Sequence, residues 1–143
     1  MAESTSPGKG HVKERMIRQR RYGPVLTAAA EASNAIAVGI QMRTYEASDN
    51  EYVDATESMT LECHLVDDNG TDALVAAFTM AETGNGAEIS ATGQPRLIIS
   101  TDASGTATVT VTDVSGAFAG SVHLLVNVLN KPGFHAHLEL TFA

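Results

Sequence analysis

Residues 36–43 read Ile-Ala-Val-Gly-Ile-Gln-Met-Arg, a stretch in which every second side chain is large and apolar. Successive side chains of an extended chain point to opposite faces, so this spacing gives the stretch an apolar face and a small or polar face. The apolar face consists of Ile36, Val38, Ile40 and Met42. A period of two is typical of a β-strand that is buried on one face only.

The same period returns along the rest of the chain. Further β patterns cover residues 25–30, 59–65, 73–80, 97–99, 106–112, 119–128 and 134–142. We expect residues 25–30 to form an edge strand, and Asn69-Gly70 predicts a hairpin that joins 59–65 to 73–80. Seven or eight short strands, with no helix between them, predict an all-β fold, specifically an immunoglobulin-like β-sandwich.

Composition restricts the chain to one domain with an aliphatic core. The 143 residues are enough for a single core, hydrophobic residues make up 43% of them, aromatic residues only 5%, and Trp is absent. The single cysteine, Cys63, excludes an intramolecular disulfide and a cysteine-based zinc site. No stretch resembles a secretion signal or a bilayer-spanning segment, so we expect synthesis in a cytoplasm and no membrane partner.

Charge is divided unequally along the chain. Residues 1–24 carry six basic and two acidic side chains, a net charge of +4, whereas residues 25–143 carry three basic and fifteen acidic ones, a net charge of −12. Gly23 and Pro24 disfavour continuation of a helix across this point. The sequence therefore predicts a basic N-terminal arm over 1–24, ordered only by a partner, and a sandwich domain over 25–143.

The arm is the predicted partner-binding segment. Basic side chains in it would contact an acidic surface, and apolar ones between them would anchor the contact. These residues are Lys9, Lys13, Arg15, Met16, Ile17, Arg18, Arg20, Arg21 and Tyr22. Two other interpretations stay open: a solubilising tail, and an arm that neutralises nucleic-acid phosphates. We favour a protein partner, because a body of charge −12 repels a polyanion.

Histidine and acidic residues are the remaining candidates for chemistry. Aligning the apolar faces of 119–128 and 134–142 brings His123 opposite Glu139, which makes a metal site of His123, His137 and Glu139 conceivable beside the simpler interpretation of a polar strand surface. Cys63 falls on the inward face of its strand and is expected to act as a small apolar residue. Asp67, Asp68 and Asp72 lack the spacing of a known calcium loop, and no residue set predicts catalysis or a cofactor.

The order of the β segments resembles that of small immunoglobulin-like structural proteins of tailed bacteriophages. The similar segments are ASNAIAVGIQM at 32–42, LVDDNGTD at 65–72, TDASGTATVTVTD at 101–113 and the closing LTFA at 140–143. The resemblance implies a virion protein of the capsid decoration or cement type, or a tail, connector or fibre component. The basic arm is not part of the resemblance, and it favours the cement role.

These observations together predict a non-enzymatic protein located on the capsid surface of a virion. The arm would bridge subunits of the major capsid protein, and neighbouring copies of this chain would be further partners. The alternative is a receptor- or glycan-binding module, in which loops at one end of the sandwich hold the ligand. Tyr45 and Tyr52 are the aromatic residues near such a loop.

Overall fold

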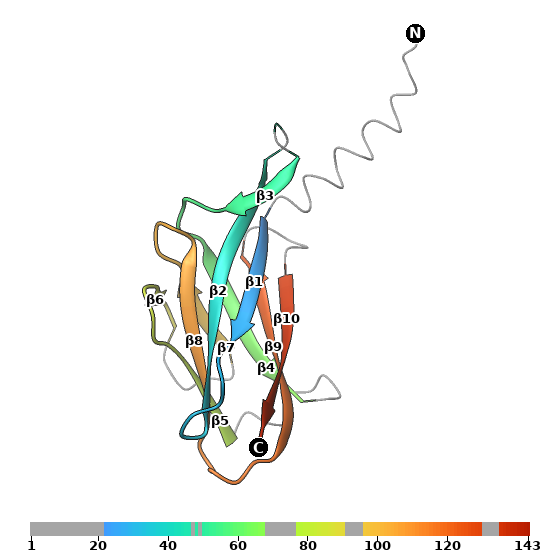
Figure 1. The fold of residues 1–143 in the computed structure, drawn as a ribbon. Helices are drawn as coiled ribbons and strands as arrows, with labels where there is room; N and C mark the ends of the chain where they lie inside the picture. Colours follow the sequence, from blue (N-terminus) through green and yellow to red (C-terminus); the bar gives the residue numbers. More distant parts are fainter. Residues whose placement is uncertain (1–21, 47, 49, 68–76, 91–95, 130–134) are drawn as a thin grey trace.

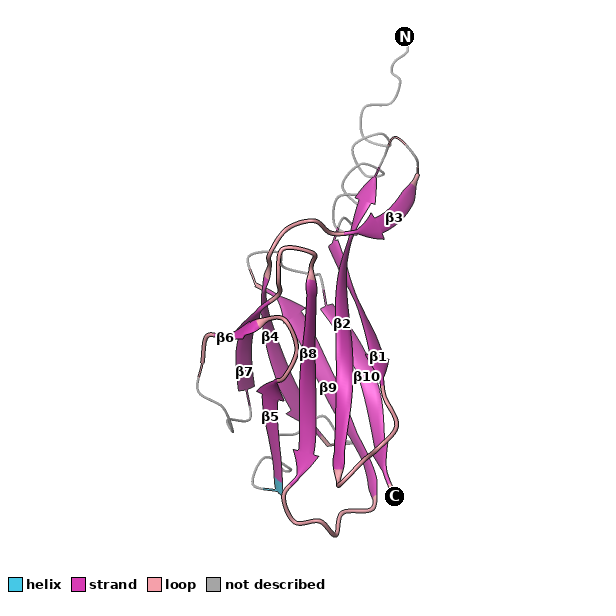
Figure 2. Ribbon diagram, turned by 60° about the vertical axis from the view of Figure 1, so that its left-hand side comes forward, coloured by secondary structure: helices cyan, strands magenta, loops and turns pink. Residues whose placement is uncertain are grey.

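The computed structural model describes residues 22–46, 48, 50–67, 77–90, 96–129 and 135–143. Two antiparallel sheets pack face to face, as Figures 1 and 2 show from two directions. The predicted all-β sandwich is therefore confirmed. Among the described residues there is no helix long and apolar enough to cross a membrane.

The first sheet has the strand order β1-β2-β8-β5, and β3 pairs with the far end of β2. Its strands are β1 (Tyr22–Ala28), β2 (Ala35–Glu46), β3 (Glu51–Asp54), β5 (Phe78–Glu82) and β8 (Thr106–Asp113). β1 lies at the edge, as predicted, but it begins at Tyr22. Tyr22, Gly23 and Pro24, assigned from the sequence to the arm, thus occupy the first positions of this strand.

The second sheet has the order β10-β9-β4-β7-β6. Its strands are β4 (Thr60–Val66), β6 (Ala87–Glu88), β7 (Arg96–Ser100), β9 (Gly120–Val128) and β10 (His135–Phe142). The register between β9 and β10 pairs His123 with Glu139, as the sequence predicted. Within the described ranges the two sheets hold ten strands, more than the seven or eight expected, because β3 and the two-residue β6 have no clear period of two.

The sheet order is that of an immunoglobulin constant-type domain with additions. In that fold, strands A to G form one sheet in the order A-B-E-D and a second sheet of C, F and G. Here β1, β2, β8 and β5 take positions A, B, E and D, and β4, β9 and β10 take C, F and G. β6 and β7, which follow β5 in the chain, extend the second sheet beyond β4.

The predicted hairpin at Asn69-Gly70 is wrong. β4 belongs to the second sheet and pairs with β9 and β7, whereas β5 belongs to the first and pairs with β8. The two strands therefore belong to different sheets instead of pairing side by side. Alternating burial is the same in both arrangements, so the sequence period could not distinguish them. The turn residues themselves lie outside the described part of the chain.

The core is aliphatic over most of its length, as the composition predicted. Fully buried Leu, Ile, Val and Met side chains from both sheets fill it. Three aromatic rings gather at one end of it, where Phe78 lies 5.1 Å from Phe118 and 5.4 Å from Phe142 in edge-to-face contacts. Such contacts add to the stabilisation that burial provides, so these three phenylalanines strengthen one end of the core.

Sheet edges are short or covered. The first and last strands, β1 and β10, lie side by side although they belong to different sheets (Figures 1 and 2). At the opposite side the edges are β5 and the two-residue β6. Short or covered edges leave few free backbone groups for pairing with another chain.

Candidate functional site

The predicted attachment residues cannot be placed. Lys9, Lys13, Arg15, Met16, Ile17, Arg18, Arg20 and Arg21 all lie outside the described residues. Of Tyr22 only the backbone is described, and it pairs with Thr44 of β2. Binding of a partner by these residues therefore stays a prediction.

The arm joins the body at a firmly paired strand. β1 pairs with β2 in continuous register from Tyr22↔Thr44 to Ala28↔Val38. Beyond this strand, β2 and β3 form a two-stranded ribbon that projects from the end of the sandwich (Figure 2). Side-chain contacts hold the ribbon: Arg43 Nε lies 3.3 Å from an Asp54 carboxylate oxygen, the rings of Tyr45 and Tyr52 meet edge to face at 5.3 Å, and the Tyr45 hydroxyl donates a hydrogen bond to Asn50 Oδ1.

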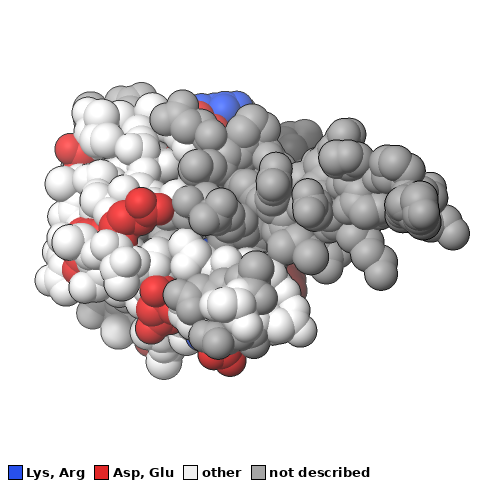
Figure 3. Space-filling model, turned by 90° about the horizontal axis from the view of Figure 1, so that it is seen from above, with Lys and Arg blue, Asp and Glu red and all other residues white. Residues whose placement is uncertain are grey.

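The described surface is strongly acidic. Twelve acidic and two basic residues fall within the described ranges. Both basic residues are already paired, Arg43 with Asp54 and Arg96 with Glu62 at 3.6 Å. Figure 3, which views the end from which the arm leaves, shows acidic side chains at several places on this end.

A pair of histidines lies on the outer face of the second sheet. His123 Nδ1 of β9 and His137 Nε2 of β10 are 2.7 Å apart, and the ring centroids are 4.9 Å apart at an angle of 33°. The β9–β10 register explains the contact, because His123 pairs with Glu139 and so lies diagonally across from His137. The sequence predicted that these side chains share a face, but not that the imidazoles touch.

The three-residue metal site is not assembled. Among the described residues no group of three His, Cys, Asp or Glu side chains could hold a metal ion, although Glu139 is the strand partner of His123. His135, two residues before His137 on β10, pairs with Asn127. His64 of β4 pairs with Leu125 of β9. Four of the five histidines of the chain thus lie on β4, β9 and β10, and His123 and His137 contact each other.

Cys63 and the acidic residues carry no reactive arrangement. Cys63 is fully buried, and burial, with a smaller contribution from the charge of Glu62, raises the pKa of its thiol to about 12. The thiol therefore behaves as a small apolar group, as predicted. Asp68 and Asp72 of the weak calcium candidate lie outside the described residues.

Two aspartates at strand ends stabilise the turns that follow them. The pKa of Asp102 is lowered mainly by hydrogen bonds from the backbone and hydroxyl of Thr106. The pKa of Asp113 is lowered first by the Ser115 hydroxyl and then by the backbone N–H of Phe118. The signal in the sequence was an Asp at a strand end with Ser or Thr two to four residues later.

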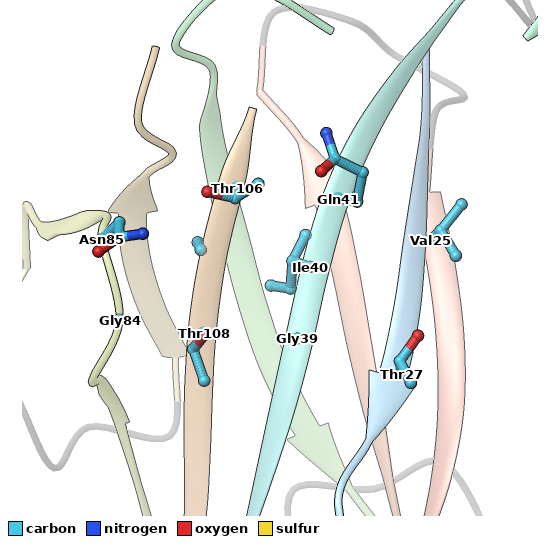
Figure 4. Close-up of a pocket in the computed structure, with 10 residues that line it drawn as sticks. Val25, Thr27, Gly39, Ile40, Gln41, Gly84, Asn85, Thr106 and Thr108 are labelled. Carbon is cyan, nitrogen blue, oxygen red and sulfur yellow. The ribbon is translucent and has the colours of Figure 1, made fainter. Parts of the chain in front are cut away.

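A hollow of about 430 Å³ opens on the outer face of the first sheet (Figure 4). Gly39 of β2 forms its floor, because a Cβ there would meet only the Thr27 backbone oxygen at 3.7 Å. Val25 and Thr27 of β1 lie on one side of it, and Thr106 and Thr108 of β8 on the other. None of the described residues that line it is charged, and Gln41 and Asn85 add amide groups. A glycine inside an alternating strand was the sequence signal for this feature.

Comparisons with known proteins identify no family. No protein-family profile and no curated protein sequence matches this chain. Two crystal structures of the Parabacteroides merdae β-glucuronidase align with it at TM-scores of 0.42 and 0.43 and at 15% and 14% sequence identity. Each alignment covers 84% of this chain but only 12% of the glucuronidase chain, so this chain spans about an eighth of that enzyme's length.

Proposed function

We propose that this chain is a non-enzymatic attachment protein that decorates the outer surface of a phage capsid and stabilises the shell. The observation that carries the proposal is the division of charge, +4 on residues 1–24 against −12 on residues 25–143. A basic segment joined to an acidic body attracts acidic surfaces only through the segment. The arm, and not the body, therefore faces an acidic partner.

The body supplies a rigid support for this segment. The arm continues directly into β1, whose seven residues are all paired with β2. A partner bound by the arm is therefore connected to a packed sandwich and not to a loop. The proposed partner surfaces are acidic patches of neighbouring major capsid protein subunits, with Lys13, Arg15, Arg18, Arg20 and Arg21 as the contacting cations.

Many weak contacts would stabilise a shell together. A ligand that binds only the assembled state stabilises it by mass action, and a regular surface presents the same site many times. The acidic bodies, with twelve acidic and two basic residues in the described ranges, repel each other and favour a spaced arrangement. In a tail, connector or fibre, the chain would attach through the same arm but be present in fewer copies per virion.

Deletion of residues 1–21 tests the proposal. We expect the truncated protein to fold with the thermal midpoint of the full chain but to lose cosedimentation with capsids of the phage that encodes it. The matched control replaces the six arm cations by Gln and keeps the arm length. Capsid binding by both variants at the level of the full chain would refute the attachment role of the arm.

Copy number then separates the locations. Quantitative mass spectrometry of purified virions gives the ratio of this chain to the major capsid protein. We expect hundreds of copies per particle for a cement protein, whereas a handful would assign the chain to the tail or connector and contradict the proposed capsid location.

A second candidate function, a receptor- or glycan-binding module, is favoured by the hollow over Gly39. Its threonine hydroxyls and amides suit a neutral polar ligand, and Tyr45 and Tyr52 lie further along β2 and β3. Replacing Gly39 with Leu would fill the hollow, since a Cβ there would meet only the Thr27 backbone oxygen, at 3.7 Å. Loss of cell-surface binding in Gly39→Leu, with capsid binding unchanged, would support this function.

A further inference from the structure

The contact between His123 and His137 brings together two nitrogens that could also bind a metal ion. The contacting atoms, Nδ1 of His123 and Nε2 of His137, are both potential metal-ligating nitrogens. They come from adjacent strands of one hairpin, so their separation is set by the β9–β10 register. His123 is half-buried and His137 is exposed, which leaves one side of the pair open to solvent.

The two nitrogens are close enough together for one metal ion to bind both. With metal–nitrogen bonds of 2.0–2.1 Å, two ligands are about 3.3 Å apart at a tetrahedral angle and about 2.9 Å apart at a right angle. The 2.7 Å contact is a hydrogen-bond distance, and of the two separations the right-angle value is the nearer to it. Right angles between nitrogen ligands are typical of tetragonal Cu²⁺ and Ni²⁺ sites, and Cu²⁺ binds nitrogen ligands more tightly than its neighbours in the series.

We propose that His123 and His137 form a two-histidine site for a late transition-metal ion, with Cu²⁺ preferred. The site is independent of the attachment function proposed above. Because the described residues contain no third protein ligand in position, water completes the coordination shell. The acidic body, of net charge −12 over residues 25–143, favours the approach of a cation.

Metal binding rearranges one hydrogen. In the metal-free pair, one of the two contacting nitrogens carries the hydrogen of the short contact. Coordination needs a lone pair on both, so His123 takes the tautomer protonated at Nε2 and His137 the one protonated at Nδ1. When the pair carries an additional proton, this proton is released to water as the metal binds.

Binding should weaken in acid, because protons compete for the same lone pairs. We therefore expect the affinity for Cu²⁺ to fall as the pH is lowered below neutral. The charged and titratable groups along the same sheet face are His135 and Glu139 on β10, Glu62 and His64 on β4, and Arg96 on β7.

Titration of the untagged full-length protein with Cu²⁺ tests the site. We expect one equivalent to bind, and we expect His123→Ala and His137→Ala each to weaken binding by about tenfold or more. His135→Ala is the matched control, because His135 lies on the same strand and face but pairs with Asn127. It should leave the affinity unchanged, and thermal denaturation of each variant checks that it folds.

A second measurement does not depend on variants. Cu²⁺ is paramagnetic, so at substoichiometric metal the backbone amide NMR signals nearest residues 123 and 137 should broaden first. Equal affinity in the wild type, His123→Ala and His137→Ala would overturn the proposal. So would an equal loss in His135→Ala, or first broadening elsewhere in the chain. Tighter binding of Zn²⁺ than of Cu²⁺ would contradict the assigned preference for Cu²⁺.

Discussion

Asp113 shows how one side chain fixes the connection between the two sheets. It stands at the end of β8, is 4% exposed, and uses both carboxylate oxygens. One oxygen accepts hydrogen bonds from the backbone and hydroxyl of Ser115, and the other accepts one from the backbone of Phe118. Phe118 in turn packs against Phe78 in the aromatic end of the core.

Replacing Asp113 with Asn should lower the thermal midpoint at neutral pH. An amide offers one accepting oxygen and turns an NH₂ group towards a donor, so one of the two sets of hydrogen bonds is lost. Differential scanning calorimetry at pH 7 measures the change. Glu57→Gln, at an exposed position, is the control and should have no effect. An unchanged midpoint in Asp113→Asn would contradict the role given to this carboxylate.

The difference in thermal midpoint between the wild type and Asp113→Asn should depend on pH. Folding lowers the pKa of Asp113 from its usual 3.8, so the ionised carboxylate stabilises the folded state at pH values above the unfolded pKa. This stabilisation is lost as the pH falls through the folded pKa. The gap in midpoint between the wild type and Asp113→Asn should therefore be full above about pH 5 and shrink below about pH 4.

Two glycines should respond oppositely to a methyl group. Gly105 has a φ of +73°, and a Cβ there would lie 3.1 Å from Ala55 Cβ and 3.2 Å from Met42 Cβ. Gly105→Ala should therefore cost about 1–3 kcal/mol of unfolding free energy. Gly39→Ala, with space above it, should cost nothing or gain up to about 1 kcal/mol. Urea unfolding measures both, and equal effects would contradict the conformations assigned here.

At the scale of elements, β1 separates the arm from the body. Leu26 packs against the core, and the strand covers the edge of β2 beside β10. Removing residues 1–21 should leave the unfolding free energy unchanged, whereas removing residues 1–28 should lower it by about 2 kcal/mol or more. Chemical denaturation of both truncations measures this. A large loss on removal of residues 1–21 would mean that the arm is part of the folded body.

Sequence patterns predicted the elements better than their connections. β2, β8 and β9 carry a strict period of two, and each was expected within about three residues of its observed bounds. The partner of β5 was not predictable, because burial alternates in the same way whether a strand pairs with β4 or joins the other sheet. Which sheet a strand joins depends on long-range packing that one local pattern does not contain.

The same limit applies to the candidate sites. The position of His123 opposite Glu139 followed from the apolar faces of a single hairpin, which is a local relation. The contact between His123 and His137 depends on side-chain orientation, and the hollow over Gly39 needs β1, β2 and β8 together. Both were therefore beyond what periodicity can predict.

For the whole molecule, unbalanced charge should make the stability depend on salt. Twelve acidic residues and two basic ones in the described ranges repel each other on balance. Raising NaCl from about 0.01 M to about 1 M shortens the screening length from about 30 Å to about 3 Å. The thermal midpoint of the protein lacking residues 1–21 should therefore rise with salt. A midpoint that falls with salt would show that its ion pairs outweigh the repulsion.

The pairing of β1 also determines how the molecule responds to a mechanical force. The arm leaves from Tyr22, at the end of a strand that is paired through seven consecutive positions to Ala28. A pull on the arm directed away from the body along the strand axis would slide β1 lengthwise past β2 and strain all of these pairs together. A pull on Ala28 away from the sheet would instead break them one after another. A pull along the strand axis therefore loads all seven β1–β2 pairs in shear.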